Sequence, residues 1–396
     1  MGPGILAGLS DDDPAGITTY SILGAKYGYE LLWVLAVSTA ALIVFHLLGA
    51  RMGVVTRQGV IALVRTHRGR RATRIVVGAL VIANVGTMCA ELAGVAASLE
   101  LLVGMTRYLS VPLAGVAVSA LVLRGSFHRV EHVLLVLSAV FVTYIVSGFL
   151  AHPDWGEAAK GLVIPHLPLT RDALLVAVAT IGTTLAPWGL VFIQSYAADK
   201  RLEVKDLRFE NIDVIVGSIL TGVIGLFVVV GCAATLHVSG IEIDDAKDAA
   251  KALEPLAGGG ASTLFGLGFL GAALLAAAIV PLSTAYSVAD AAGKPCDIDD
   301  SFEEARLFYL SYGAVVGLAA VLVLIPGVPL IQILFLSQAL NAVLLLAILP
   351  YMRHLAQDPA VMGDHRLGRT GRVATGVALA LIAASVLALG VLTLLG

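Results

Sequence analysis

Residues 8–16 read Gly-Leu-Ser-Asp-Asp-Asp-Pro-Ala-Gly and interrupt an apolar segment at the start of the chain. Pro14 lacks a backbone N–H and disfavours helix in the residue before it, so we expect a helical break here and a new half-helix near Asp13. The break leaves carbonyl oxygens without helical partners, from about Ser10, beside carboxylates. Because hard divalent cations bind such oxygens, this stretch is a candidate ion site.

An alternative is that the first residues form a short soluble tail before a span that starts at Ile17. The apolar run Gly4–Leu9 argues against a tail, since it predicts a preceding half-helix. Gly16 adds backbone freedom beside the proline. Gly16 and Ala186 are also candidates for the metal site, and Trp188 is a candidate for the ion path. Asp11 and Asp12 are candidates for an ion path, and the sequence does not decide which of them faces it.

Residues 180–189, Thr-Ile-Gly-Thr-Thr-Leu-Ala-Pro-Trp-Gly, place a second proline within an apolar segment. One such kink is weak evidence, because prolines are common in membrane helices. Two interruptions at matching positions of two halves, however, are typical of a transporter site built from inverted repeats. The pair therefore predicts a substrate site between the first and sixth spans.

The composition supports a membrane-embedded chain. Of its 396 residues, 58% are hydrophobic and 13% are charged, and the mean hydropathy is +0.93. A soluble domain carries about 25% charged residues, and a spanning helix needs about 20 apolar ones. We predict an all-α integral membrane protein of eleven spans, at roughly 2–25 (interrupted), 30–50, 76–103, 108–123, 131–150, 172–198 (interrupted), 212–238, 262–291, 307–325, 328–351 and 373–395.

The distribution of basic residues predicts the orientation. When segments after even-numbered spans are assigned to the cytoplasm, they hold 19 of the 25 Lys and Arg residues, seven of them in 51–74. The positive-inside rule then predicts a cytoplasmic N-terminus and an extracellular C-terminus. The acidic stretch Glu242–Glu254 is external in this map. We interpret it as a solvated loop, with a cation-attracting vestibule as the alternative.

Ionisable and polar residues inside spans give further candidates. Glu91, in the third span, is a candidate for ion coupling, with a structural hydrogen bond between helices as the alternative. Gln338 and Asn341 lie three residues apart on one face of the tenth span. They are candidates for oxygen ligands or water contacts, or for polar contacts between helices. His46 and His237 are interpreted as interfacial, and no metal-binding motif includes them.

These segments resemble the NRAMP family of divalent metal transporters, from Gly2 to about Tyr351. The resemblance is strongest in GPGILAGLSDDDPAGITTYSILGAKYGYELLW, GTMCAELAG and GTTLAPWGLVFIQS. It implies a LeuT-type fold, with two inverted five-helix repeats at about 1–150 and 172–351, unwound helices one and six, and an extra helix at 373–395. It implies that the whole chain, 1–396, is a single transporter domain.

The departures from the family pattern are informative. Its first-helix motif Asp-Pro-Gly-Asn is Asp13-Pro14-Ala15-Gly16 here, and its sixth-helix motif Met-Pro-His is Ala186-Pro187-Trp188. The third-helix Asp is Met88, whereas Glu91 matches the family's Glu. The pattern is similar to the NRAMP-related magnesium transporters, a prokaryotic branch. Without a thioether, the remaining ligands are oxygens from Asp13, from the backbone near Ser10 and Thr183, and from Gln338, which suit a hydrated Mg²⁺.

The sequence thus predicts an importer of Mg²⁺, and also of Mn²⁺, that works by alternating access without proton coupling. The metal is its substrate, and no cofactor is expected. The alternatives are a proton-coupled Mn²⁺/Fe²⁺ importer and an organic-solute transporter on the same scaffold, which Asp13 disfavours for anions. An intramembrane enzyme is a further alternative, but there is no HExxH, Ser/His or Ser/Lys constellation. We expect a monomer in the plasma membrane, in contact with lipid, with no nucleic-acid partner.

Overall fold

The computed structural model describes residues 12–123, 142–199, 202–294 and 302–395. Every regular element in these ranges is helical. The longer helices are α2 (Pro14–Tyr27), α3 (Leu32–Thr56), α4 (Val60–Val103), α5 (Arg107–Leu123), α9 (Arg171–Thr184), α10 (Pro187–Asp199), α11 (Leu207–Cys232), α14 (Ala261–Ala292), α15 (Arg306–Val323), α16 (Leu330–Leu355) and α18 (Arg369–Leu395).

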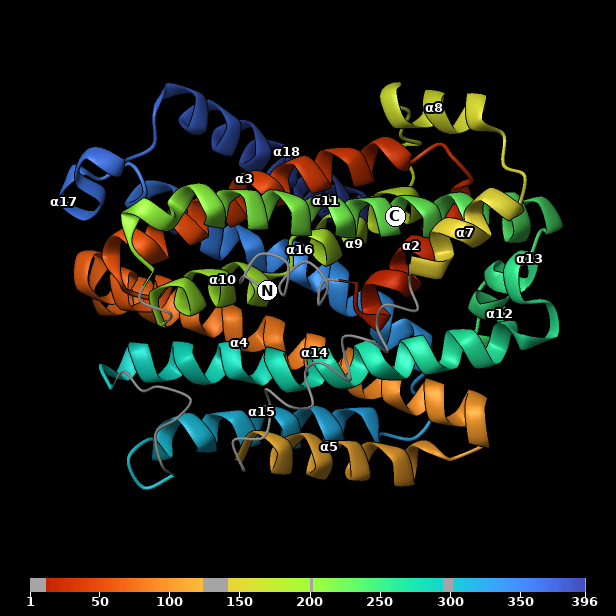
Figure 1. The fold of residues 1–396 in the computed structure, drawn as a ribbon, viewed down its shortest axis with the longest axis horizontal. Coiled ribbons are helices and arrows are strands. Elements are labelled where there is room, and N and C mark those ends of the chain that lie inside the picture. Colours follow the sequence, from red (N-terminus) through yellow and green to blue (C-terminus); the bar gives the residue numbers. More distant parts are fainter. Residues whose placement is uncertain (1–11, 124–141, 200–201, 295–301, 396) are drawn as a thin grey trace.

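The long helices run side by side in a bundle (Figure 1). Helix α4 packs against both α14 and α16 at the centre of the bundle, and α5 and α15 lie together along one flank. Short helices mark the two ends. Helices α8 (Trp155–Val163), α12 (Ala246–Ala250) and α13 (Glu254–Ala257) lie at one end, and α17 (Pro359–Met362) lies at the other. The connections predicted to be external and cytoplasmic thus occupy opposite ends of the bundle.

Eight helices of the described chain are long and apolar enough to cross a bilayer by length and composition. They correspond to spans two, three and six to eleven of the predicted map, with α9 and α10 counted together as span six. Helix α5 is a shorter apolar helix at span four, and α7 (Thr143–Leu150) is the described part of span five. The all-α membrane architecture is therefore confirmed.

The predicted connection 51–74 is largely helical. Helix α3 continues to Thr56, and α4 begins at Val60, well before the expected start of the third span. The first turns of α4 bury Val60, Ile61 and Val64 in the core, whereas residues 65–71, which carry most of the arginines of this segment, are exposed. Gly69, at φ 75°, marks the kink between this part and the spanning part of α4.

Candidate functional site

Asp13 lies where α2 begins. Its backbone is extended, and its Oδ1 accepts a hydrogen bond of 2.6 Å from the backbone N–H of Gly16. Pro14 occupies the first helical position, which needs no N–H donor. The expected start of a half-helix near Asp13 is confirmed. Asp13 is 4% exposed and one of its carboxyl oxygens is held by the helix, so its carboxyl group is fixed inside the bundle. Ser10 and Asp11 lie outside the described residues.

The sixth span is broken as expected. Helix α9 ends at Thr184, Leu185 leaves helical geometry at φ −110° and ψ 59°, and α10 begins at Pro187. Because Pro187 has no N–H, the carbonyl of Thr183 lacks the donor that would follow it in a continuous helix. The carbonyl of Ala186 accepts from Gly189 and Leu190 and so starts α10. The Thr183 carbonyl therefore lacks its usual helical donor, whereas Ala186 contributes only a small side chain.

Helices α2 and α9 are joined to each other by hydrogen bonds, while the half-helix expected before α2, at Gly4–Leu9, lies outside the described residues. The hydroxyls of Tyr20 in α2 and Thr184 in α9 are 3.0 Å apart. At the far ends of the same helices, the Tyr27 hydroxyl donates to Asp172 at 2.7 Å and the Lys26 ammonium lies 3.2 Å from the same carboxylate. Helices α2 and α9 are thus coupled between the middle of α2 and the end of α9, and between the C-terminal end of α2 and the start of α9.

Glu91 lies on the face of α4 that is directed at the first break. The side chain is 0% exposed, and its carboxyl group interacts with that of Asp13. A Cβ added to Gly94, one turn further along α4, would lie 2.7 Å from the Cβ of Pro14, so the backbones of α4 and α2 approach closely here. The structure therefore brings Glu91 and Asp13 together.

The same face of α4 carries two further polar residues, Asn84 and Thr87. The Asn84 amide donates to the Thr284 hydroxyl of α14 at 2.8 Å. Thr87 accepts from the Asn341 amide of α16 at 3.1 Å. The spacing 84, 87, 91 places all three on one helical face. Sequence reasoning singled out only Glu91, although this periodicity was a signal that could have revealed the others.

Gln338 and Asn341 form the polar part of α16. The Asn341 amide donates to the Gln338 Oε1 at 3.0 Å, and the Gln338 amide donates to the Ser337 hydroxyl at 2.9 Å. Gln338 is 1% exposed and Asn341 is 0% exposed. Because an amide oxygen has two lone pairs, Gln338 Oε1 retains one for an ion or water. Asn341 is instead occupied in joining α16 to α4.

Several buried polar atoms near the breaks have no protein hydrogen-bonding partner among the described residues: Thr183 Oγ1, both carboxyl oxygens of Glu91, Trp188 Nε1 and Asn84 Oδ1. The neighbouring hydroxyls of Thr180 and Thr184 differ, since each donates to the carbonyl four residues earlier. Buried polar groups are normally satisfied by protein, water or ions. These atoms therefore fit a hydrated polar site between α2, α4, α9 and α10.

Trp188 and the two histidines singled out in the sequence are all held by contacts within the structure. Trp188 is 0% exposed in the first turn of α10, where its carbonyl accepts from the Ser283 hydroxyl at 3.3 Å. Its ring contacts Phe192 at 6.4 Å between centroids. The interfacial interpretation of His46 is wrong, because this residue is 1% exposed near the middle of α3. His237 bonds the Ala25 carbonyl through Nδ1 at 2.9 Å.

The backbone of α16 packs closely against α9 just before the second break. A Cβ added to Gly182 would overlap the carbonyl oxygen of Gln338 and would lie 2.6 Å from the backbone nitrogen of Ala342. Both obstacles are backbone atoms, which cannot move aside as a flexible side chain would. Gly182 is therefore required for α9 and α16 to hold Thr183 and Gln338 next to each other.

We expect Gly182→Ala to destabilise the protein by about 3 kcal/mol, the upper range for overpacking. The control Gly313→Ala, on α15, meets no atom within 4 Å and is expected to be neutral or slightly stabilising. Thermal unfolding of the purified protein in detergent measures both. Equal melting temperatures for the two variants would show that the α9–α16 contact is loose.

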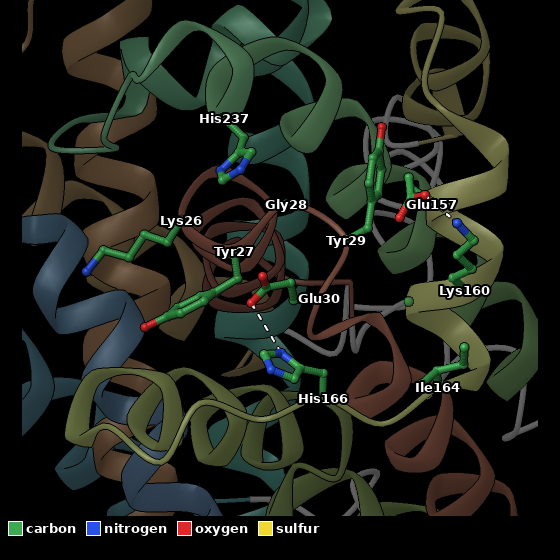
Figure 2. A pocket seen from close by; sticks show the side chains of 11 residues that line it. Lys26, Tyr27, Gly28, Tyr29, Glu30, Glu157, Lys160, Ile164, His166 and His237 are labelled. Carbon is green, nitrogen blue, oxygen red and sulfur yellow. Dashed lines mark hydrogen bonds and ion pairs between the residues drawn. The ribbon is translucent and has the colours of Figure 1, made fainter.

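A separate cavity of about 460 Å³ lies at the outer end of α2 (Figure 2). Figure 2 shows Glu30 facing His166, at 3.6 Å, while Lys160 pairs with Glu157 of the same helix at 2.6 Å. Helix α2 rises about 1.5 Å per residue, which puts this cavity about 20 Å from Asp13. It is therefore distinct from the site at the breaks. Among the described residues, no group of three or more His, Cys, Asp and Glu side chains is placed to hold a metal.

The family model of natural resistance-associated macrophage protein-like proteins, Nramp, matches residues 4–392. The chain belongs to the Nramp family. Among curated Nramp relatives, a protein of Burkholderia ambifaria named "Divalent metal cation transporter MntH" is 32% identical over 279 residues. That match covers 67% of this chain and 62% of the relative, less than two thirds of its length. The protein of the same name from Erwinia tasmaniensis is 27% identical over 372 residues, with 92% and 87% covered.

Solved structures show the fold of this Nramp chain. The Eremococcus coleocola manganese transporter, in complex with an aromatic bis-isothiourea substituted compound, matches with a TM-score of 0.79 at 19% identity, covering 98% of this chain and 85% of that one. Mhp1, a nucleobase-cation-symport-1 family transporter, matches with a TM-score of 0.61 at 15% identity, with 100% and 91% covered. The expected LeuT-type architecture is confirmed.

Proposed function

We propose that this Nramp protein is a divalent cation transporter that imports Mg²⁺, and also Mn²⁺, by alternating access. The observation that carries the proposal is the donor set at the two breaks. Asp13 supplies one fixed carboxylate, Thr183 supplies a carbonyl without a helical donor, and Gln338 retains an amide lone pair. All of these are oxygens, which hard cations prefer.

The side chain at position 186 supports a hard cation rather than a soft one. Where the family motif has methionine, Ala186 lies buried between α9 and α10 with no sulfur. Thioethers favour softer metals, so their absence weakens discrimination against Mg²⁺. Mg²⁺ loses its water reluctantly and binds through one or two carboxylates. The unpartnered Thr183 hydroxyl and Trp188 indole N–H suit the water shell of such an ion.

We further propose that the membrane potential, and not a proton gradient, drives this import. Each charge gains about 2.3 kcal/mol per 100 mV, so a divalent ion gains about twice that. The histidine of the family's sixth-helix motif is Trp188 here. The family's third-helix aspartate is Met88, which is buried and cannot carry a proton. Neither position can therefore relay protons.

A proton-coupled Mn²⁺/Fe²⁺ importer is the second candidate function, and one observation favours it. Glu91 is fully buried and interacts with Asp13, so it is placed to exchange a proton when a cation arrives. The two candidates differ in whether protons accompany the metal.

The organisation that follows from this proposal is a single transporter domain of two inverted repeats, at about 1–150 and 172–351, and an extra helix at 373–395. We propose that the protein is a monomer in the plasma membrane, with the N-terminus in the cytoplasm and the C-terminus outside. The concentration of basic residues at the end of the bundle that contains α17 supports this orientation.

Uptake into proteoliposomes tests the proposed function. With an inside-negative potential, Mg²⁺ is expected to enter, and to compete with Mn²⁺ uptake at millimolar concentration, without acidifying the lumen. A lumen that acidifies in proportion to metal uptake, or Mn²⁺ uptake that is indifferent to Mg²⁺, contradicts the proposal. Acidification in proportion to metal uptake would support the proton-coupled candidate.

A further inference from the structure

Two cavities between α3 and α18 form one continuous groove. The first, of about 310 Å³, contains Arg51, Thr370 and Gly371 in its wall. The second, of about 320 Å³, is lined mainly by alanine, valine, leucine and isoleucine side chains. Val44 and Ala374 belong to both walls, so the cavities meet there. The groove therefore has one polar and one apolar end.

The groove runs along the helices rather than across them. On α3 its wall extends from Val37 to Arg51, and on α18 from Ile382 back to Thr370, so the two helices line it in opposite directions. At 1.5 Å per residue, each of these stretches is about 20 Å long. The hydrocarbon core of a bilayer is about 30 Å thick, so the groove is about as long as one leaflet with its headgroups.

The polar end carries a cation without an acidic partner. Arg51 forms no ion pair within the described part of the chain. A second guanidinium, of Arg353, lies nearby, since its Nε donates to Thr375, another residue of the wall, at 3.3 Å. This end is the one where basic residues are concentrated and where anionic lipid headgroups attract cations most strongly.

The apolar end reaches the break of the sixth span. Ile181 and Leu185 of that break line the groove, and the Leu185 N–H donates to the Ile181 carbonyl at 2.9 Å. Opposite them lie Ala378 and Ile382 of α18. A chain of methylene groups in this part of the groove would pack directly on the residues where α9 ends.

We propose that this groove binds one anionic phospholipid, with its phosphate at Arg51 and Thr370 and one acyl chain extending toward Leu185. The polar-to-apolar gradient, the length of one leaflet and the unpaired guanidinium match this ligand together. Arg51 is the reason for proposing an anionic headgroup. The lipid belongs to the inner leaflet if the protein has the orientation proposed above. The lipid site is independent of the transported ion.

Native mass spectrometry of the purified full-length protein tests the site with phosphatidylglycerol and phosphatidylcholine. We expect one phosphatidylglycerol to be retained in preference to phosphatidylcholine. Arg51→Gln should reduce that preference about fivefold, the effect of one cation near a charged surface, and Arg51→Lys should preserve it. Arg208→Gln, on an exposed cytoplasmic arginine outside the groove, is the matched control and should change nothing.

Ala374→Leu fills the junction of the two cavities and should reduce retention of both lipids at least about tenfold. Ala384→Leu, on the exposed face of the same helix, is its control. If Ala374→Leu melts earlier than the parent, Ala40→Leu, at an exposed position of the same wall, replaces it. Unchanged lipid retention in Arg51→Gln and in the filled variant overturns the proposal.

Two further measurements exclude other occupants. Inorganic phosphate and glycerol 3-phosphate should not displace the lipid, because neither fills the apolar end. Complete displacement by either would show that the groove recognises only a phosphate group, and the lipid proposal would fail. Light scattering should give the same mass for the parent and Ala374→Leu. A dimer that this substitution dissociates would show that a second copy of the chain covers the groove, and the lipid proposal would fail.

Discussion

Asp13→Asn is expected to lower divalent cation uptake at least about 100-fold, since even outer-shell partners of a metal contribute 10–100-fold. The amide keeps an oxygen that can accept from the Gly16 N–H, so the start of α2 is preserved. What is lost is the negative charge, which every proposed ligand set requires. Initial rates of Mg²⁺ and Mn²⁺ uptake into proteoliposomes measure the effect.

Asp154→Asn is the matched control for this prediction. Asp154 begins α8 as Asp13 begins α2, and its Oδ1 accepts from the N–H groups of Gly156 and Glu157. It lies on an exposed helix at the outer end of the bundle, so its variant should transport at the parent rate. Retained uptake by Asp13→Asn, in a protein that melts like the parent, would place the ion site elsewhere.

The two breaks were predictable because proline acts locally. Pro14 and Pro187 remove a helical donor whatever surrounds them, and the structure begins α2 and α10 at these two residues. The extent of α4 was not predictable in the same way. The arginines of 51–74 placed this segment on one side of the membrane but did not reveal its helices, nor that Val60, Ile61 and Val64 are buried while residues 65–71 are exposed. Which part of a charged segment is buried depends on neighbours that are distant in sequence.

Some candidate site residues could likewise be predicted from the sequence, and others could not. Asp13 and Glu91 were identified because charge within an apolar span is rare. Asn84, Thr87 and Tyr20 were not, because neutral polar residues are common in membrane helices and acquire a role only through partners. The partner of Tyr20 is Thr184, 164 residues away, and that of Thr87 is Asn341, 254 residues away. Such pairs follow from the packing of α2, α4, α9 and α16.

Ala186→Met should shift selectivity from Mg²⁺ toward Mn²⁺ and Cd²⁺ by about 10- to 100-fold, because a thioether is a soft ligand. Ala186 is 4% exposed in the break between α9 and α10, and we expect the longer side chain to reach the space between the breaks. There it displaces water that a hydrated Mg²⁺ needs and offers sulfur to softer ions. Competition of Mg²⁺ and Cd²⁺ with Mn²⁺ uptake measures the change.

Ala186→Leu separates the two causes, since leucine fills a similar volume without sulfur. If the methionine acts as a ligand, only Ala186→Met gains Cd²⁺ transport, whereas both variants lose Mg²⁺. If both variants lose Mg²⁺ and neither gains Cd²⁺, position 186 controls only the space for hydration. A methionine variant that keeps the parent's order of competition would show that this side chain does not face the ion, and the argument for Mg²⁺ from Ala186 would fall with it.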